Sequence, residues 1–238
     1  MGKRAIILAG GKGTRLKPYT ISLPKPLVPI GETPILEVII RQLKSSGFDH
    51  ITLTVNHMAD IIQAFFGDGS KWGIKIDYSF ETKALSTMGP LTIIKDLPEH
   101  FLVMNGDVLT NLPFAQFYDE HVQNGHSFTI ASYNRTDKVE YGVLTSNENS
   151  ELVKFEEKPA KSYLVSMGVY MMSKLNIQHI PKDTFFGFDH LMNKLIIEKE
   201  YPKLYKFDGY WLDCCKLFVS LFLKPCARAA APLLLAFI

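Results

Sequence analysis

The first half of the chain alternates short apolar runs with segments that have helical spacing. Arg4–Ala9 is an apolar run that ends in glycines, and Pro34–Ser46 places its large apolar residues on one helical face. Ile51–Val55 and Phe101–Met104 are further β-type runs. Strands that alternate with helices pair mostly in parallel, through right-handed crossovers. The pattern therefore predicts an α/β fold built on a mostly parallel sheet.

The second half is richer in strands. The remaining elements expected from local pattern are helices over Asp60–Phe66, Pro113–Gln123 and Asp189–Glu200, and strands over Ile74–Phe80, Ser127–Tyr133, Gly142–Thr145, Leu152–Phe155 and Tyr163–Met171. No repeat or low-complexity linker divides the chain, so we expect one domain over residues 1–216 and an apolar tail over 217–238. Charges and prolines interrupt the tail before about 18 apolar residues accumulate, so we expect it to pack on protein and not to span a membrane.

Composition narrows the class of protein. The chain has 238 residues, 47% of them hydrophobic, and a net charge of +2. This composition is globular, and the small net charge argues against general binding of nucleic acid. Three cysteines form no metal-ligand spacing, and the first residues do not resemble a signal peptide, so we expect a cytoplasmic protein. A homo-oligomer is compatible with all of this.

The first chemical motif is the loop Gly10–Arg15, directly after the first predicted strand. Its three glycines let backbone N–H groups approach an anion, and two cations in the loop favour a phosphate site over a plain turn. A dinucleotide fingerprint would need glycine where Leu16 stands, which disfavours a dinucleotide-dependent oxidoreductase. A P-loop would need Ser or Thr after Lys12, where Gly13 stands.

Four short motifs add fixed charges. Lys25 lies between two prolines, which could hold a cation in place for a triphosphate, although a solvated lysine in such a loop is also common. Asp107 follows an apolar strand, where a lone carboxylate suits Mg²⁺, although an Asx turn explains the local sequence nearly as well. Glu157-Lys158 could bind a sugar and a phosphate or be a solvated strand end, and Asp213 follows an aromatic pair.

Taken together, these motifs in this order resemble the sugar-1-phosphate nucleotidyltransferase family, from about Ile6 to Asp213. The resemblance is strongest to its GDP-mannose pyrophosphorylase branch. It implies a single Rossmann-like domain with a mixed sheet flanked by helices. It also implies a reaction in which a sugar-1-phosphate attacks the α-phosphorus of an NTP and releases pyrophosphate. An anionic phosphate nucleophile needs no general base, so alignment and charge neutralisation can supply catalysis.

The resemblance also implies roles for individual residues. Arg15 and Lys25 would stabilise the triphosphate, and Asp107 and Asp213 would hold Mg²⁺. The sugar-1-phosphate would be bound by Gly142, Glu157 and Lys158. The nucleotide would be bound by Leu8, Ala9, Gly10, Gly11, Gly13, Thr14, Glu81 and Gly89. The chain departs from the family pattern at Ser86 and Met88, where small residues are usual, and at Ser166, where asparagine is usual.

The base is predicted from Glu81. By the resemblance, Glu81 stands where thymidylyltransferases of the family have glutamine, and Glu81-Thr82 is similar to the GDP-mannose enzymes. Guanine offers two neighbouring donors, and a carboxylate only accepts hydrogen bonds, so Glu81 at this position favours GTP over UTP or dTTP. The predicted acceptor is mannose-1-phosphate or a manno-heptose-1-phosphate. Two alternatives stay open: a uridylyl-, thymidylyl- or cytidylyltransferase of the same family, and a catalytically silent relative that binds a sugar nucleotide and regulates a partner.

Overall fold

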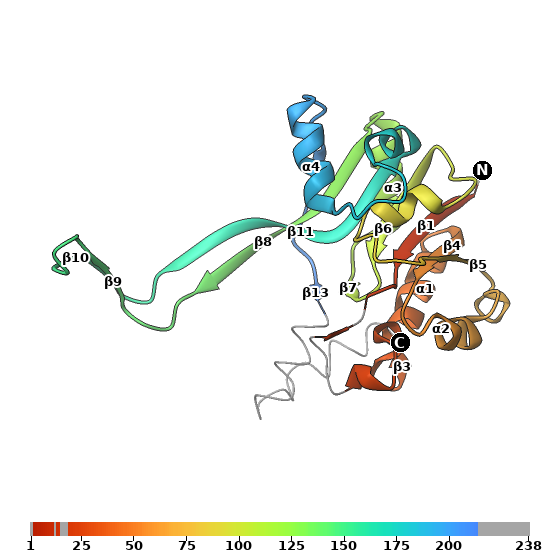
Figure 1. Ribbon diagram of the computed structural model, residues 1–238, viewed down its shortest axis with the longest axis horizontal. Coiled ribbons are helices and arrows are strands. Elements are labelled where there is room, and N and C mark those ends of the chain that lie inside the picture. Colours follow the sequence, from red (N-terminus) through yellow and green to blue (C-terminus); the bar gives the residue numbers. More distant parts are fainter. Residues whose placement is uncertain (1, 12, 15–18, 214–238) are drawn as a thin grey trace.

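The computed structural model describes residues 2–11, 13–14 and 19–213. Its centre is a seven-stranded sheet (Figure 1). In spatial order the strands are β12 (Lys203–Phe207), β8 (Phe128–Lys138), β11 (Ala160–Ser173), β6 (His100–Asn105), β1 (Lys3–Leu8), β4 (Phe48–Val55) and β5 (Lys75–Phe80). Only β11 runs antiparallel to its neighbours, so the sheet is mixed and mostly parallel. The predicted α/β class is confirmed.

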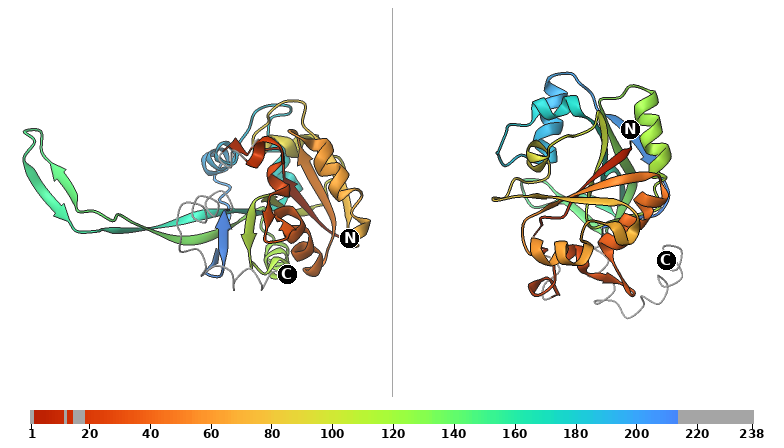
Figure 2. Two further views of the ribbon diagram at one scale, coloured as in Figure 1. Left: turned by 90° about the horizontal axis from the view of Figure 1, so that it is seen from below. Right: turned by 90° about the vertical axis from the view of Figure 1, so that its right-hand side faces the viewer.

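Helices cover both faces of the sheet because alternate strand residues point to opposite sides. Ala5 and Ile7 of β1 belong to the apolar layer that includes residues of α1 (Ile35–Ser45), α2 (Ala59–Phe66) and α3 (Phe114–Gln123). Ile6, between them, belongs to the other layer, which includes Leu191 and Leu195 of α4 (Phe188–Ile197). Figure 2 shows α2 and α4 on opposite sides of the sheet.

Several elements differ from the sequence expectation. Helix α4 ends at Ile197, three residues earlier than predicted, and Glu198 turns back so that its Oε2 lies 2.8 Å from Nδ1 of the buried His179. The short strands β2, β3, β7 and β13 and the edge strand β12 were not predicted. Their bounds are Pro29–Ile30, Thr33–Pro34, Val108–Thr110 and Trp211–Asp213 for the first four, and the 3₁₀ helices are Tyr19–Ile21, Lys25–Leu27, Ser70–Trp72, Gly89–Ile93 and Lys174–His179.

The outer parts of β8 and β11 leave the body as a two-stranded ribbon (Figures 1 and 2). Pairing between them continues as far as Lys138 opposite Ala160, beyond the last residues that β12 covers. A small hairpin, β9 (Val143–Ser146) and β10 (Leu152–Glu156), forms the end of the ribbon. We call residues 134–165 the arm and the rest of the described chain the body.

None of the helices in residues 2–11, 13–14 and 19–213 is long and apolar enough to cross a bilayer. The predicted tail over 217–238 lies outside the described residues, as does Arg15. The division into a domain over 1–216 and a tail stays a prediction.

Candidate active site

The main site lies at the carboxyl ends of the central strands. Strand β1 pairs with β4 on one side and with β6 on the other. The chain continues from β1 to β4 and β5 and later crosses to β6, so the strand order reverses at β1, which makes this edge a topological switch point. A cavity of about 590 Å³ opens there. Its lining includes five of the residues predicted to bind the nucleotide: Leu8, Ala9, Gly10, Gly11 and Glu81. We call it the larger cavity.

The glycine loop is shaped by close contacts. A Cβ atom at Gly10 would lie 2.9 Å from Oε1 of Glu81, so only glycine lets the loop and this carboxylate approach each other. Gly13 has a φ of +60°, and its carbonyl accepts a 2.7 Å hydrogen bond from Oγ1 of Thr20. A Cβ there would also crowd Lys25, so the loop and this lysine are neighbours.

Lys25 and Asp107 form an ion pair, and both residues line the larger cavity. Lys25 begins a 3₁₀ turn that is fixed by Pro24 before it and by the buried Pro26 after it. Asp107 follows the end of β6, where the N–H of Gly106 donates to the carbonyl of Leu8 at 3.0 Å. Both side chains line the same cavity, and the roles predicted for them, Lys25 at the triphosphate and Asp107 at Mg²⁺, stay predictions.

The larger cavity is also lined by polar groups suited to a base. Burial raises the pKa of Glu81 above its usual value, and the backbone N–H of Leu85, 3.3 Å from Oε2, partly opposes this. The hydroxyl of Thr54 is buried and has no hydrogen-bond partner within the described residues. Asn56 also lines this wall. These groups offer a ligand both acceptors and donors in a partly desolvated setting.

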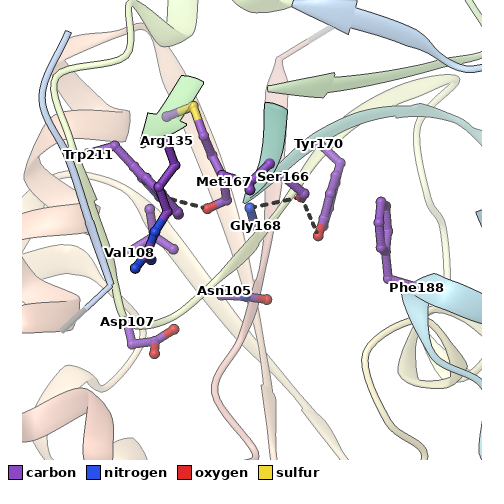
Figure 3. A pocket seen from close by; sticks show the side chains of 11 residues that line it. Asn105, Asp107, Val108, Arg135, Ser166, Met167, Gly168, Tyr170, Phe188 and Trp211 are labelled. Atoms are coloured by element: carbon purple, nitrogen blue, oxygen red, sulfur yellow. Dashed lines mark hydrogen bonds between the residues drawn. The ribbon is translucent and has the colours of Figure 1, made fainter. Parts of the chain in front are cut away.

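A smaller cavity of about 360 Å³ adjoins the first, between the root of the arm and the strand β13. One wall is aromatic, since Tyr170 stacks on Phe188 with ring centroids 4.5 Å apart. The other is held by Trp211, whose Nε1 donates to the carbonyl of Met167 at 3.0 Å. Figure 3 shows the guanidinium of Arg135 pointing into this cavity, toward the end where Asp107 lies.

The two cavities share Asn105 and Asp107. Gly168, at a bulge in β11, makes this junction possible: its φ is +75°, and a Cβ would lie 2.6 Å from Nδ2 of Asn105. A molecule in each cavity would therefore meet the other beside the Asp107 carboxylate. The chemistry that this permits is a reaction between two bound ligands at that point.

The donors near Asp107 fit a divalent cation. Strand β13 pairs antiparallel with β7, and the register places the backbone of Asp213 opposite Val108, next to Asp107 in the chain. The side chain of Asp213 lies outside what the structure describes. Carboxylate and amide oxygens, from Asp107 and Asn105, are ligands that Mg²⁺ prefers when it shares itself with phosphates.

The residues predicted to bind the sugar phosphate lie elsewhere. Gly142, Glu157 and Lys158 are close to one another on the arm: a Cβ at Gly142 would lie 3.3 Å from Oε2 of Glu157 and would clash with the ring of Phe155. None of them lines either cavity. Figure 1 shows the hairpin that carries them far from the sheet edge where the cavities open.

Four other positions singled out in the sequence lie in or near the larger cavity or in the apolar core. Gly89 lies beside the larger cavity without lining it, and a Cβ there would come within 2.6 Å of the carbonyl of Thr184. Ser86 lines the larger cavity with a φ of +64°, whereas Met88 is buried in the apolar layer beneath α4. Thr14 is exposed and does not line the cavity.

Sequence reasoning missed Arg135, Thr54 and the Tyr170–Phe188 pair. Arg135 gave no signal because it lies in an ordinary polar stretch of the sequence. Strand β8 continues past Tyr133, where its pairing with β12 ends, and no local pattern shows this. The position of Thr54 at the end of a β-branched strand, at the same edge as Asp107, could have suggested it.

Comparison with known proteins gives one family. The model of the nucleotidyl transferase family matches residues 4–217. A UTP–glucose-1-phosphate uridylyltransferase of Synechocystis is 31% identical over 234 residues, covering 90% of this chain and 60% of the relative. A mannose-1-phosphate guanylyltransferase catalytic subunit beta of Drosophila pseudoobscura is 33% identical, covering 89% and 59%. This chain thus spans about 60% of the length of these curated relatives.

Solved structures agree with the fold. HddC from Yersinia pseudotuberculosis, complexed with GMP-PN, superposes with a TM-score of 0.66 at 26% sequence identity. The match covers 90% of this chain and 94% of that one. The strand-end cavity, the paired Lys25 and Asp107 and the match over residues 4–217 lead to one conclusion. This chain belongs to the nucleotidyl transferase family.

Proposed function

We propose that this protein is a sugar-1-phosphate nucleotidyltransferase that uses GTP and mannose-1-phosphate or a manno-heptose-1-phosphate. The observation that carries the proposal is the pair of adjoining cavities that share Asn105 and Asp107. The NTP would occupy the larger cavity, and the sugar would lie against the aromatic wall of the smaller one. The two substrates would then meet at Asp107, as the reaction requires.

In this reaction a phosphate oxygen of the sugar-1-phosphate forms a bond to the α-phosphorus of the NTP. The bond between the α-phosphorus and its bridging oxygen breaks, and pyrophosphate leaves with that electron pair. The nucleophile is already anionic, so the chain needs to align it and to offset charge. Lys25 would neutralise the leaving pyrophosphate, together with Arg15, and Arg135 would attract the incoming phosphate.

Asp107 and Asp213 would hold Mg²⁺, which supplies further charge neutralisation at the phosphates when bound. Their roles follow from the motif match and are supported by the register of β13 on β7. Lys158 and Glu157 would bind the phosphate and hydroxyls of the sugar-1-phosphate. Neither residue lines the smaller cavity in this structure, so this binding requires the arm to approach that cavity. A reaction that consumes an NTP is compatible with the cytoplasmic location predicted for this protein.

The preference for guanine rests on Glu81, which lines the larger cavity and lies beside Gly10. Its carboxylate can accept from the two adjacent donors of guanine. The binding of GMP-PN by HddC supports the same base. The uridylyltransferase among the relatives keeps UTP as the competing candidate. Glu81→Gln would relax the preference toward UTP by roughly 1–3 kcal/mol, the cost of a mismatched buried hydrogen bond.

A matrix of NTPs against sugar-1-phosphates, assayed by pyrophosphate release with Mg²⁺, tests the proposal. GTP with mannose-1-phosphate or a manno-heptose-1-phosphate should give the highest kcat/KM. Faster turnover of UTP, CTP or dTTP would refute the base and leave the reaction class. Binding of a sugar nucleotide without any turnover would favour the silent regulatory relative.

A further inference from the structure

A cluster of one histidine and two glutamates lies at the end of the sheet opposite the cavities. His179 ends the 3₁₀ helix that follows β11, and Ser173, the last residue of β11, is paired with His100 at the start of β6. The cavities open where β6 ends. Glu198 and Glu200 come directly after α4. The reaction proposed above makes no use of this cluster.

The end of α4 brings both carboxylates to one imidazole. The N–H of Glu200 donates to the carbonyl of Leu195 at 2.9 Å. The N–H of Lys199 donates to the carbonyl of Ile196 at 3.1 Å, and its φ is +61°, which completes a Schellman turn. The chain therefore reverses between the two glutamates. Carboxylates at the C-terminus of a helix meet the negative end of its dipole, so a cation is favoured at this position.

The imidazole of His179 is almost wholly buried, with 8% of its side chain exposed, and a carboxylate faces each ring nitrogen. Nδ1 lies 2.8 Å from Oε2 of Glu198, a normal hydrogen-bond distance. Nε2 lies 3.5 Å from Oε2 of Glu200 and 3.4 Å from the amide nitrogen of Gln178. If the Nδ1–H donates to Glu198, the lone pair of Nε2 points toward the Glu200 carboxylate. Two acceptors then face each other unless a cation lies between them.

The distances around Nε2 match a tetrahedral metal centre. Zinc binds imidazole nitrogen at about 2.0–2.1 Å and carboxylate oxygen at about 2.0–2.2 Å, so two such ligand atoms lie about 3.4 Å apart. The separation of 3.5 Å between Nε2 and the Glu200 oxygen is close to this value. A half-turn of the Gln178 amide would present its oxygen to the same point. Glu198 has the position of the carboxylate that accepts the other ring N–H of a metal-bound histidine.

We propose that His179 and Glu200 bind a divalent transition-metal ion, with zinc as the cation that fits best, and that Glu198 orients the imidazole. One ligand atom from each of the three residues lies within 4.8 Å of the others. A nitrogen and oxygen ligand set suits zinc, whereas magnesium and calcium prefer oxygen alone. The ion joins the chain after β11 to the end of α4, whose first residue, Phe188, stacks on the aromatic wall of the smaller cavity. It stabilises the fold and takes no part in the proposed reaction.

Zinc binding to the full chain tests the site. Protein stripped with a chelator and then desalted is titrated with Zn²⁺ against a competing chromophoric chelator. Excess Mg²⁺ is present throughout to occupy sites built of oxygen ligands. We expect the wild-type chain to bind one equivalent of Zn²⁺ and to melt at a higher temperature when it is bound. Glu198→Gln should weaken binding roughly 10–100-fold, the usual effect of losing an orienting partner.

Removal of a ligand should have a larger effect than Glu198→Gln. Glu200→Gln should weaken binding at least 100-fold, and because the side chain is 45% exposed the fold should tolerate the change. His179→Gln should abolish tight binding. A wild-type chain that binds no Zn²⁺ under these conditions would show that a proton, and not a metal ion, lies between the two side chains, and would overturn the proposal. Unchanged affinity in both ligand variants would place the ion elsewhere and overturn it equally.

The matched control lies at the other end of the same helix. His190 also has a carboxylate neighbour, with Nδ1 3.7 Å from Oδ1 of Asp189, but its side chain is 47% exposed. His190→Gln should leave the affinity for Zn²⁺ unchanged, and a loss as large as that in Glu200→Gln would also contradict the site. Binding is measured without substrate, so a failure of the proposed nucleotidyl transfer would not affect the outcome.

Discussion

The body and the arm differ in how far their apolar side chains are covered. In the body, the central strands β1 and β6 are buried on both faces, and residues as distant in sequence as Leu8 and Asp107 line one cavity. In the arm, two paired strands carry their apolar side chains without a covering layer. Five of the residues predicted to bind the nucleotide thus line one cavity of the body. The predicted sugar-phosphate half lies on an element that has no partner among the described residues of its own chain.

The largest expected effect comes from breaking the body's half of the site. Asp107→Asn removes the carboxylate that both cavities share while keeping the side-chain shape. We expect kcat/KM to fall by roughly a hundredfold or more, because charge stabilisation at the phosphates is lost. Steady-state pyrophosphate release, with a thermal melt to show that the fold is intact, measures this.

Asp119→Asn is the matched control, since this aspartate pairs with Lys3 at 2.7 Å on the surface of the body. An exposed pair of this kind contributes about 0–1 kcal/mol, so activity should be unchanged. Full activity of the Asp107→Asn enzyme, or full wild-type activity in excess EDTA, would contradict the assigned role of this carboxylate.

The second-largest effect is expected from a substitution in the arm. Lys158→Ala should raise the KM for the sugar-1-phosphate roughly tenfold to a hundredfold, the value of a hydrogen bond to a charged group, and leave the KM for the NTP unchanged. Lys161→Ala, also exposed on the arm, should change neither. Lys158→Arg should restore binding only in part, since a planar fork replaces a point charge. Equal increases in both KM values would indicate that Lys158 supports structure instead.

A third effect distinguishes the interior of the body from the arm, which contains no histidine. His121 is buried in α3, with Nδ1 2.8 Å from Oγ1 of Thr129 and Nε2 3.1 Å from Nδ1 of His100. Burial, with nearby His100 and His126, lowers its pKa from 6.5 to about 4. The unfolded chain therefore binds the proton first as the pH falls from 6.5 toward 4, and stability is lost over that window.

The expected loss in the free energy of unfolding is about 2 kcal/mol between pH 7 and pH 5, measured by urea denaturation. His121→Leu should remove this part of the pH dependence, and His57→Gln, on an exposed loop residue, should not. A wild-type stability that stays constant from pH 7 to pH 5 would show that His121 is readily protonated in the folded protein.

The body was largely predictable because its signals are local. The apolar spacing of Ile35, Val38, Ile39 and Leu43 predicted α1, and all four are buried against the sheet. Asp107 was found because a strand end in an α/β fold is where ligands bind. The pairing of β13 with β7 joins residues about 100 apart, so no local pattern contains it.

The arm was predictable only in part. The two strands of its hairpin were expected and are confirmed. Their direction in space depends on where β12 stops covering β8, which is a tertiary fact. For the same reason neither the exposure of Tyr141 nor the entry of Arg135 into a cavity could be foreseen.

The smallest expected effect compares one backbone conformation in both regions. Ser86 in the body has a φ of +64°, and Ser150 at the arm hairpin has a φ of +62°. A residue with a side chain is strained there and glycine is not, although glycine also has more entropy to lose on folding. Ser86→Gly should raise the free energy of unfolding by about 0.5–1 kcal/mol, because the residue is part of the cooperatively folded body.

Ser150→Gly relieves the same strain in a hairpin that opens on its own, so the main unfolding transition should not move. Slower amide hydrogen exchange over Asn147–Glu151 should report the gain instead. If both variants shift the main transition equally, the arm unfolds together with the body, and the contrast between the two regions lies only in their exposure.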